Sequence, residues 1–401
     1  MRRFFILLLV CLLLSGCRVN PAAMEGYTPT AAPTEPETQP PTTVPLDPME
    51  QLLDSMSTEQ LVGQLFLARY PGYEAAKSAV SAYHIGSFIL FGTDYRDNTP
   101  ENIAAQMQAL QESAALPLLI ATDEEGGDVA RVSAYNQYRE SRFSSPRKLF
   151  DQGGLPLVLE AEAEKCLLLQ RVGVNVNMGP VCDVTTNPDA FMYRRSIGQD
   201  AQTTGQFVAG MVETMAQHKI GSVLKHFPGY GNNADTHVGT AVDSRSLEDL
   251  ESKDLVSFKA GINAGCDAIL VSHTIVECLD NQLPASLSPI VVNYLRNNMG
   301  FDGVIVTDDL VMEAITDTYG VGESAVMAVQ AGCDLLCSSD YGQQYAAVLA
   351  AAKDGRISPR QLRDSAERVL RWKQELGLLK LSKFKCRSFD ASALVISPLF
   401  R

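Results

Sequence analysis

Eight short apolar segments, separated by helical ones, constrain the fold of this chain more than any other feature. Each consists mostly of apolar residues and lacks strict apolar–polar alternation, so each is expected to be a strand buried on both faces. The predicted strands are Gln64–Ala68, Ile85–Phe91, Leu118–Thr122, Gly173–Asn177, Ser222–Leu224, Ala268–Val271, Gly303–Thr307 and Asp334–Ser338.

Helical segments lie between these strands. The predicted helices include Pro100–Ser113, Leu157–Arg171, Thr203–His218, Ser257–Ala264 and Glu323–Ala331. Eight strands that alternate with helices predict an α/β fold, namely a single (β/α)₈ barrel of the TIM type over residues 49–380. A doubly wound open sheet is the alternative, because the number of strands read from a sequence is uncertain.

A last helix has clear boundary signals. Ser358 is a suitable N-cap, Pro359 suits the first helical position, and Gln361 follows three residues after the cap. The helix is expected to run to about Leu376, with Gly377 at its C-cap. The tail 381–401 shows no pattern that predicts a structure.

The N-terminus has the features of an export signal. Arg2 and Arg3 precede an apolar run of eleven residues, Phe4–Leu14, which is short for a membrane span. The following LSGC sequence, which ends at Cys17, resembles a bacterial lipobox. The resemblance implies cleavage after residue 16, a lipid on the Cys17 sulfur, and a location on the extracytoplasmic face of the cell membrane. An ordinary signal peptide with a chance Cys is the alternative, and it too implies export.

A linker is expected between this signal and the barrel. Residues 17–48 contain many Thr, and eight Pro lie between Val19 and Pro48, with almost no large apolar side chains. Such a composition cannot form a core and favours extended conformations. The segment is therefore expected to hold the catalytic body away from a membrane.

Composition excludes several classes of function. The net charge is −14 without a basic block, which argues against nucleic-acid binding. The nine Cys are scattered, with neither CxxC pairs nor metal-ligand spacing, so buried single thiols such as Cys266, Cys333 and Cys337 are expected rather than disulfides or a metal site. We expect a monomer.

Polar residues follow the predicted strands, where a (β/α)₈ barrel places its functional groups. In chain order they are Asp123, Glu124, Glu125 and Arg131 after the third strand, Asp183, Arg194 and Arg195 after the fourth, Lys225, His226, Asp235 and His237 after the fifth, His273 after the sixth, and Asp308 and Asp309 after the seventh. Carboxylates, cations and imidazoles are thus expected to converge on one rim.

Two of these features suggest a mechanism. Asp308 follows an apolar strand, so its carboxylate is expected at the barrel mouth, where it could attack an electrophilic carbon. Asp235 stands two residues before His237 on a Gly-rich loop, and a carboxylate there can orient the imidazole and raise its basicity.

Five ordered motifs carry a family resemblance from about Met49 to Leu379. The loop KHFPGYGNNADTH, residues 225–237, resembles the KHFPGHG-x₄-DSH signature of family 3 glycoside hydrolases of the β-N-acetylglucosaminidase type. The stretches DEEGGDVARV (123–132), NMGPVCDV (177–184), RRSIG (194–198) and GVIVTDDLVM (303–312) are similar to further motifs of that family. The loop motif is the most specific, because other branches of the family lack it.

The resemblance implies retaining hydrolysis on a barrel, without metal or organic cofactor. Asp308 matches the nucleophile, His237 the general acid/base, and Asp235 its partner. The residues that match those gripping the terminal sugar are Asp123, Arg131, Arg195, Lys225 and His226. Asp183 is a weaker match, with a capping carboxylate as the alternative.

The chain departs from the family pattern at several positions. Tyr230 replaces a usual His, Asp128 a usual Arg, Glu124 a usual Gln and Thr236 a usual Ser. The spacer between Gly231 and Asp235 is one residue shorter, and the Leu-Pro that usually follows the loop is absent. The shorter spacer leaves the path of the loop open, and Asp128 leaves the aglycone preference open.

The expected function is an exo-acting β-N-acetylglucosaminidase, of the β-N-acetylhexosaminidase class, acting on GlcNAc-containing peptidoglycan fragments. A family 3 β-glycosidase of other specificity, such as a β-glucosidase, and a sugar-binding lipoprotein are the alternatives. A His acid/base is neutral after it gives up its proton, so phosphate as well as water is a conceivable acceptor.

Overall fold

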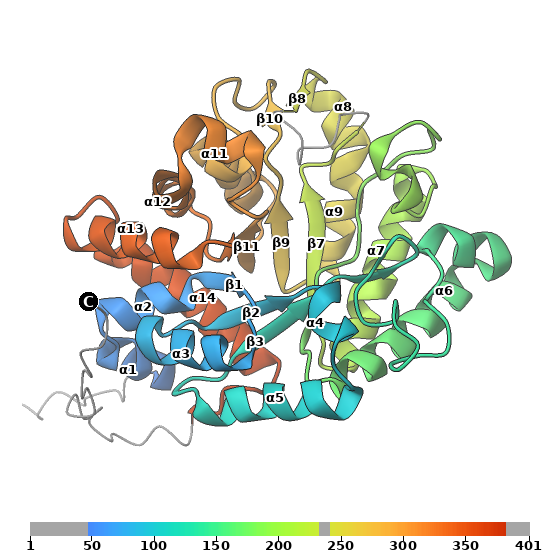
Figure 1. Cartoon of the computed structure of the whole chain (residues 1–401). Helices are drawn as coiled ribbons and strands as arrows, with labels where there is room; N and C mark the ends of the chain where they lie inside the picture. Colours follow the sequence, from blue (N-terminus) through green and yellow to red (C-terminus); the bar gives the residue numbers. More distant parts are fainter. Residues whose placement is uncertain (1–46, 232–240, 382–401) are drawn as a thin grey trace, which may run out of the picture. The chain divides into compact units, whose positions relative to one another are not determined.

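Eight parallel strands curl into a barrel in the computed structural model, which describes residues 47–231 and 241–381 (Figure 1). The sheet order is β11-β9-β7-β6-β3-β2-β1-β12. These strands are β1 Phe66–Arg69, β2 Ser87–Leu90, β3 Leu119–Thr122, β6 Val176–Asn177, β7 Gly221–Phe227, β9 Ala268–Val271, β11 Val304–Thr307 and β12 Leu336–Ser338.

Backbone contacts between β11 and β12 bring the two ends of this sheet together. Val306 bridges Leu335 in parallel, the Thr307 N–H donates to the Leu335 carbonyl at 3.0 Å, and the Leu335 N–H donates to the Ile305 carbonyl at 3.1 Å. All eight predicted strands are present and the barrel is nearly closed. The predicted barrel is therefore confirmed, and the alternative of an open sheet is wrong.

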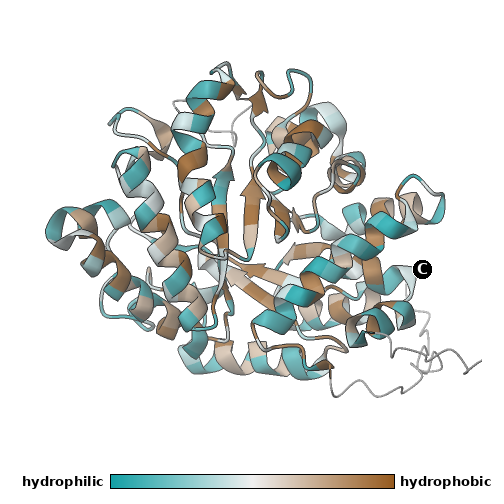
Figure 2. Ribbon diagram, turned by 180° about the vertical axis from the view of Figure 1, so that it is seen from behind, coloured by the Kyte–Doolittle hydropathy of each residue, from teal (hydrophilic) through white to brown (hydrophobic). Residues whose placement is uncertain are grey.

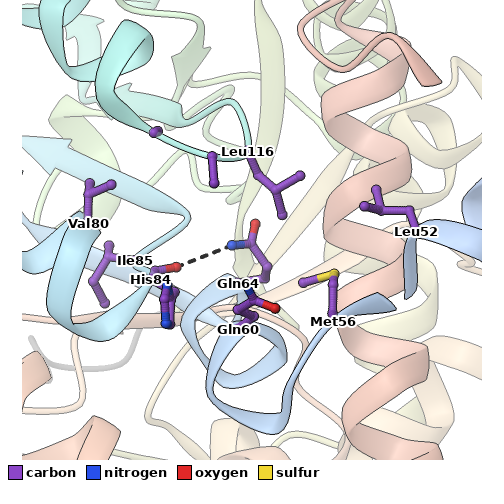
Figure 3. Close-up of a pocket in the computed structure, with 10 residues that line it drawn as sticks. Leu52, Met56, Gln60, Gln64, Val80, His84, Ile85 and Leu116 are labelled. Carbon is purple, nitrogen blue, oxygen red and sulfur yellow. Dashed lines mark hydrogen bonds between the residues drawn. The ribbon is translucent and has the colours of Figure 1, made fainter. Parts of the chain in front are cut away.

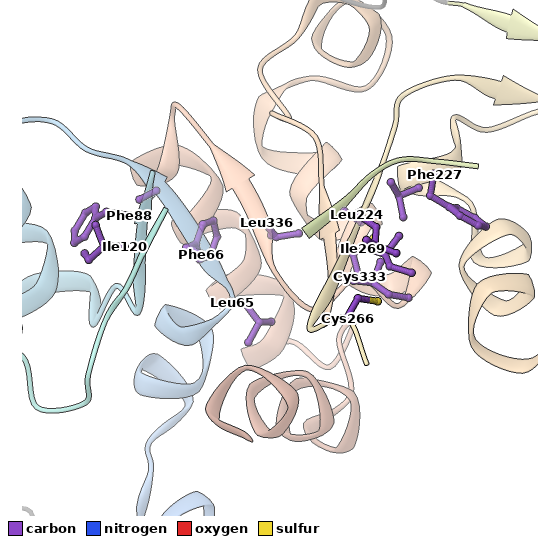
Figure 4. Packing of buried hydrophobic residues seen from close by; sticks show 14 of the residues in the cluster. Leu65, Phe66, Phe88, Ile120, Leu224, Phe227, Cys266, Ile269, Cys333 and Leu336 are labelled. Atoms are coloured by element: carbon purple, nitrogen blue, oxygen red, sulfur yellow. The ribbon is translucent and has the colours of Figure 1, made fainter. Parts of the chain in front are cut away.

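The strands are buried on both faces, as their apolar composition predicts. Along β1, Phe66 and Ala68 pack outward against the helices, whereas Leu67 points into the barrel with Ile89 and Val223. Figure 4 shows part of the outer layer, including Phe66, which lies between the strands and the surrounding helices. Single buried thiols are also confirmed, because the six described cysteines are free and five are buried.

Helices surround the barrel, with their polar faces outward and apolar faces toward the strands (Figure 2). They are α1 Pro48–Ser55, α2 Thr58–Gln64, α3 Tyr73–Tyr83, α4 Gly92–Arg96, α5 Pro100–Ser113, α6 Pro146–Arg171, α7 Ala201–Gln217, α8 Leu247–Ser252, α9 Asp254–Asn263, α10 Pro289–Asn293, α11 Glu313–Tyr319, α12 Val321–Ala331, α13 Tyr341–Lys353 and α14 Pro359–Glu375. The predicted helices are all found. Several boundaries differ from the prediction: for example, Gln64 ends α2 rather than starting a strand, and α6 begins at Pro146 and is kinked at Gly153 and Gly154.

Helix α14 begins and ends as its sequence predicts. The Ser358 hydroxyl accepts from the Gln361 N–H at 3.1 Å, and Gly377 follows the helix with a φ of 76°, a left-handed conformation that favours glycine. Trp372, Leu376 and Leu378 contact the barrel interior, and the Trp372 ring lies directly against Gly221 at the start of β7. The end of α14 thus covers the lower end of the barrel, where the strands begin.

A small cavity of about 30 Å³ lies at this lower end (Figure 3). Its lining includes Leu52 of α1, Gln64, and His84 in the turn before β2. Gln64 donates to the His84 carbonyl at 3.2 Å and accepts from the buried Lys373 ammonium at 2.6 Å. The lower end therefore contains a buried cation that donates a hydrogen bond to a neutral amide.

The predicted signal peptide, Cys17, most of the linker, and all but the first residue of the predicted tail fall outside the described residues. Within residues 47–231 and 241–381, no helix is sufficiently long and apolar to cross a membrane.

Candidate active site

A short hairpin follows β3 at the upper rim of the barrel. It is formed by β4 Glu124–Gly126 and β5 Val129–Ala130, and Glu124 fixes its shape. The buried Glu124 carboxylate accepts from the backbone N–H groups of Arg131 at 2.9 Å and Val132 at 2.7 Å. Burial raises the pKa of Glu124, while hydrogen bonds from the Ser133 hydroxyl and the Val132 N–H oppose the rise. Glu124 therefore has a structural role, and it positions Asp123 and Glu125 on either side of it.

Two carboxylates and two cations form an ion-pair cluster at this rim. The Lys225 ammonium, at the end of β7, lies 2.6 Å from Asp123 and 2.7 Å from Glu125. Arg195 binds both oxygens of Glu125 through two N–H groups, at 2.7 and 3.0 Å. Such charge-assisted bidentate contacts fix the geometry of both partners.

Opposite charges dominate the protonation of this cluster. Burial alone would raise the pKa of Glu125, but Lys225 and Arg195 outweigh it and hold the pKa well below its usual range. Burial likewise acts to lower the pKa of Lys225, and Asp123 and Glu125 reverse that effect and raise it. Glu125, Lys225 and Arg195 are thus charged, and their ion pairs hold one another in place.

His226 is held by Asp183 on one side and faces Arg195 on the other. Its Nδ1 lies 2.9 Å from the Asp183 carboxylate, and its Nε2 lies 3.3 Å from an Arg195 N–H group. Because the carboxylate accepts and the guanidinium donates, this arrangement assigns the proton of a neutral imidazole to Nδ1. Asp183 also accepts from the Tyr230 N–H at 2.7 Å, so it organises the start of the loop.

Two of the residues that depart from the family pattern, Tyr230 and Asp128, make defined contacts near the site. The buried Tyr230 ring packs edge-on against His226 at 5.2 Å and tilted against Phe191 at 5.6 Å. Asp128, at the turn of the hairpin, pairs with Arg194 at 2.8 Å on the surface. Tyr230 therefore supports the His226 ring, and the charge of Asp128 faces a cation.

Asp308 follows β11 at the same rim. Its N–H donates to the Val271 carbonyl at 3.1 Å, and its Oδ1 accepts from the Asp309 N–H at 2.9 Å. The Asp309 carboxylate instead accepts from the backbone of Ser339 at 3.1 Å. His273 is buried, and its Nε2 lies 3.0 Å from the Asp309 carbonyl. Asp309 and His273 thus shape the turn that presents Asp308.

Cys337 on β12 is a buried thiol whose backbone N–H donates to the Thr307 hydroxyl at 3.1 Å, next to Asp308 in the chain. Burial, followed by the negative charges of Asp309, Asp308 and Asp123, raises the pKa of the Cys337 thiol, and Lys225 opposes the rise. Asp308 follows β11 and Asp123 follows β3, and both strands are parallel members of the same barrel, so the two carboxylates lie at the same rim.

Arg131 lies at the edge of this site, where its Nε is 3.9 Å from Asp123 and its guanidinium is 5.7 Å from the centre of the Phe91 ring. The structure thus brings together the predicted sugar-binding residues, which are Asp123, Arg131, Arg195, Lys225 and His226. Asp235 and His237 lie outside the described residues, which end at Gly231 and resume at Ala241.

Glu125 is among the polar residues expected at the rim, but it is not among the residues predicted to bind the sugar. It binds both Lys225 and Arg195, and its place in the EEGG stretch after a strand was the available signal. In the two described ranges, no group of three His, Cys, Asp or Glu side chains could hold a metal ion.

Residues 57–372 match the profile described as "Glycosyl hydrolase family 3 N terminal domain". Beta-hexosaminidase LpqI of Mycobacterium tuberculosis is 30% identical over 328 residues, which cover 78% of this chain and 83% of LpqI. Its solved structure superposes with a TM-score of 0.75, covering 82% of this chain and 96% of that one, at 27% identity.

A second solved structure, a glycoside hydrolase family 3 beta-N-acetylglucosaminidase from Paenibacillus sp. str. FPU-7, gives a TM-score of 0.74 at 31% identity. The match covers 85% of this chain and 66% of the Paenibacillus chain.

Proposed function

Because the chain belongs to glycosyl hydrolase family 3 and is a β-hexosaminidase, we propose that it removes terminal GlcNAc from peptidoglycan-derived fragments by a retaining, exo-acting mechanism. The observation that carries this proposal is the ion-pair cluster of Asp123, Glu125, Arg195 and Lys225 at the rim of the barrel where Asp308 follows β11. Carboxylates and cations with fixed geometry suit the hydroxyls of one terminal sugar, because they offer both acceptors and donors.

The proposed reaction has two steps. In the first, the Asp308 carboxylate attacks the anomeric carbon while His237 gives a proton to the glycosidic oxygen, so that the C–O bond breaks and the aglycone leaves. In the second, His237 takes a proton from water, and the hydroxide displaces Asp308 and restores the free carboxylate. Asp235 orients the imidazole in both steps. Retaining enzymes ordinarily use two carboxylates about 5–5.5 Å apart, and here an imidazole takes the second role.

A variant without the nucleophile tests this assignment. We expect Asp308→Ala to lose roughly 10³-fold or more in kcat on a chromogenic β-GlcNAc substrate, with thermal unfolding close to that of the wild type. Asp302→Asn, which changes an exposed aspartate before the same strand, is the matched control. Mass spectrometry of a slow fluorinated GlcNAc substrate should find the sugar on Asp308. Full activity of Asp308→Ala would refute the assignment.

Sugar preference separates the proposal from its alternatives. Hydrolysis of chromogenic β-GlcNAc far above that of β-glucose supports a β-N-acetylglucosaminidase. The reverse preference would indicate a β-glucosidase, and binding without turnover would indicate a sugar-binding protein. Release of GlcNAc from cell-wall disaccharides, with and without a peptide stem, tests the proposed natural substrate.

The acceptor can be tested in the same assays. Appearance of GlcNAc 1-phosphate when phosphate is added would show phosphorolysis, while free GlcNAc alone would show hydrolysis.

The proposed location is the extracytoplasmic face of the cell membrane, through a lipid on Cys17. Labelling with a radioactive fatty acid should mark the wild type and not Cys17→Ala, and labelling of both would reject the anchor.

A further inference from the structure

Arg245, a residue outside every motif considered so far, forms the centre of a buried ionic cluster. Its guanidinium binds the Asp243 carboxylate at 2.7 and 3.0 Å and the Asp254 carboxylate at 2.5 Å. A further N–H donates to the Gly229 carbonyl at 3.1 Å. The Asp243 and Asp254 side chains are almost fully buried, and Arg245 is largely buried. One side chain thus joins three separate parts of the chain.

In the sequence, these partners lie before and after residues 232–240. Gly229 precedes that segment by a few residues, and Asp243 follows it. A Cβ added to Gly231 would lie 2.5 Å from the guanidinium carbon of Arg245, so the last described residue before the segment packs directly on this arginine. Asp254 is the first residue of α9 and ties the cluster to the outer helices.

Each side of the segment is also bound to the barrel separately. Before it, the Tyr230 N–H donates to Asp183. After it, β8 Val242–Asp243 pairs in parallel with β10 Ile275–Val276, and the Ile275 N–H donates to the Ala241 carbonyl at 2.9 Å. Asp183 therefore holds the chain before residues 232–240, and β10 holds the chain after them. Arg245 links these two flanking stretches directly to each other.

The three partners at this position require the side chain of an arginine. A guanidinium has five N–H donors spread over three nitrogens, so it can bind two carboxylates and a carbonyl at once, whereas a lysine has three donors on a single nitrogen and a shorter reach. Burial raises the pKa of Asp254 to about 6, and Arg245 opposes that rise. Removal of the guanidinium would leave Asp243 and Asp254 buried without their common cation, which is costly.

We propose that Arg245 is a positioning residue for the acid–base step, because it fixes the separation of Gly229 and Asp243 and so holds both sides of the segment that carries Asp235 and His237. This inference rests on the proposed function, in which His237 protonates the leaving group. It assigns Arg245 no contact with the substrate.

Leaving-group dependence distinguishes positioning from simple loss of stability. Departure of a sugar needs a proton from the general acid, whereas 2,4-dinitrophenolate leaves readily without one. Arg245→Lys should therefore lower kcat/KM for a GlcNAc disaccharide by about 30- to 100-fold, within the range of general acid catalysis. The same variant should lose only a few-fold on 2,4-dinitrophenyl β-GlcNAc.

Three further variants make the test decisive. His237→Ala gives the reference pattern for loss of the acid. Arg296→Lys is the matched control, because Arg296 is also largely buried and binds Asp334 and two backbone carbonyls. It should lose stability without leaving-group discrimination. Arg245→Ala should regain disaccharide turnover when guanidinium is added at low millimolar concentration.

The positioning role would be overturned if Arg245→Lys lowered kcat/KM equally on the disaccharide and on the dinitrophenyl substrate. It would also be overturned if Arg296→Lys showed the same difference between the two substrates. If Arg245→Ala does not fold, Arg245→Lys alone decides by the same ratio. If His237→Ala itself shows no leaving-group dependence, the proposed function fails, and that outcome is distinct from failure of the Arg245 inference.

Discussion

Glu125 illustrates how one side chain organises the proposed sugar site. It lies under the rim with almost no solvent exposure, and it binds Lys225 and Arg195 at once. Removing one partner of a buried charge network leaves the others uncompensated. The positions of both cations therefore depend on the charge of Glu125.

Glu125→Gln tests this dependence with a side chain of the same shape. We expect the free energy of unfolding to fall by about 3 kcal/mol, since two cations remain near a neutral amide. We also expect kcat/KM for β-GlcNAc substrates to fall at least 10-fold. Urea unfolding and steady-state kinetics measure the two effects. Glu164→Gln, which removes an exposed partner of Arg139, should change neither, and wild-type behaviour of Glu125→Gln would contradict the role.

The sequence predicted those site residues that lie in recognisable motifs directly after strands. Arg195 follows Asp123 by 72 residues and Lys225 follows Arg195 by 30, and their convergence followed from the barrel topology alone. Their pairing through Glu125, and the Nδ1 proton of His226, depend on side-chain geometry that no sequence spacing encodes.

The fourth barrel strand is shorter than predicted because a side chain makes hydrogen bonds that strand backbones usually make. The fourth barrel strand was expected over Gly173–Asn177, but β6 comprises only Val176 and Asn177. Gly173 has a φ of 78°, and the Asn175 side chain binds the Ile120 N–H at 2.8 Å and the Leu118 carbonyl at 3.1 Å. The side-chain amide replaces part of the backbone ladder, which apolar patterning cannot reveal.

Helix α14 gives a prediction at the level of one element. Ser358→Ala removes the hydroxyl that accepts from the Gln361 N–H and should lower the free energy of unfolding by about 1 kcal/mol. Ser358→Asp keeps a capping oxygen and should remain near wild type. Chemical denaturation of the three proteins measures the difference, and equal loss in both variants would show that capping is not the cause. Activity should be unchanged, because the residues around Ser358 include none of the rim residues.

Lys373 gives a prediction for the whole molecule. Burial lowers the pKa of Lys373 to about 7, against about 10.4 in an unfolded chain. Between these values the unfolded state binds more protons, so the stability of the wild type should rise with pH above 7. Below pH 7 the folded protein carries the full cost of a buried ammonium.

Lys373→Met should therefore raise the free energy of unfolding at pH 6 by roughly 1–3 kcal/mol and remove part of the increase above pH 7. Urea unfolding from pH 6 to 9 measures both effects. Lys353→Met, at a largely exposed position, is the control. Parallel pH curves for wild type and Lys373→Met would contradict the expectation.

Both ends of the described chain approach the barrel at its lower end. Leu52 of α1 lines the cavity there, Arg363 of α14 binds Glu50 and Asp54 of α1, and Leu378 contacts the barrel interior from below. The proposed sugar site lies at the opposite end, where the strands end. For biotechnology, this means that an affinity tag, a fusion partner or a resin linkage joined next to residue 47 or residue 381 would be attached on the side of the barrel away from its mouth.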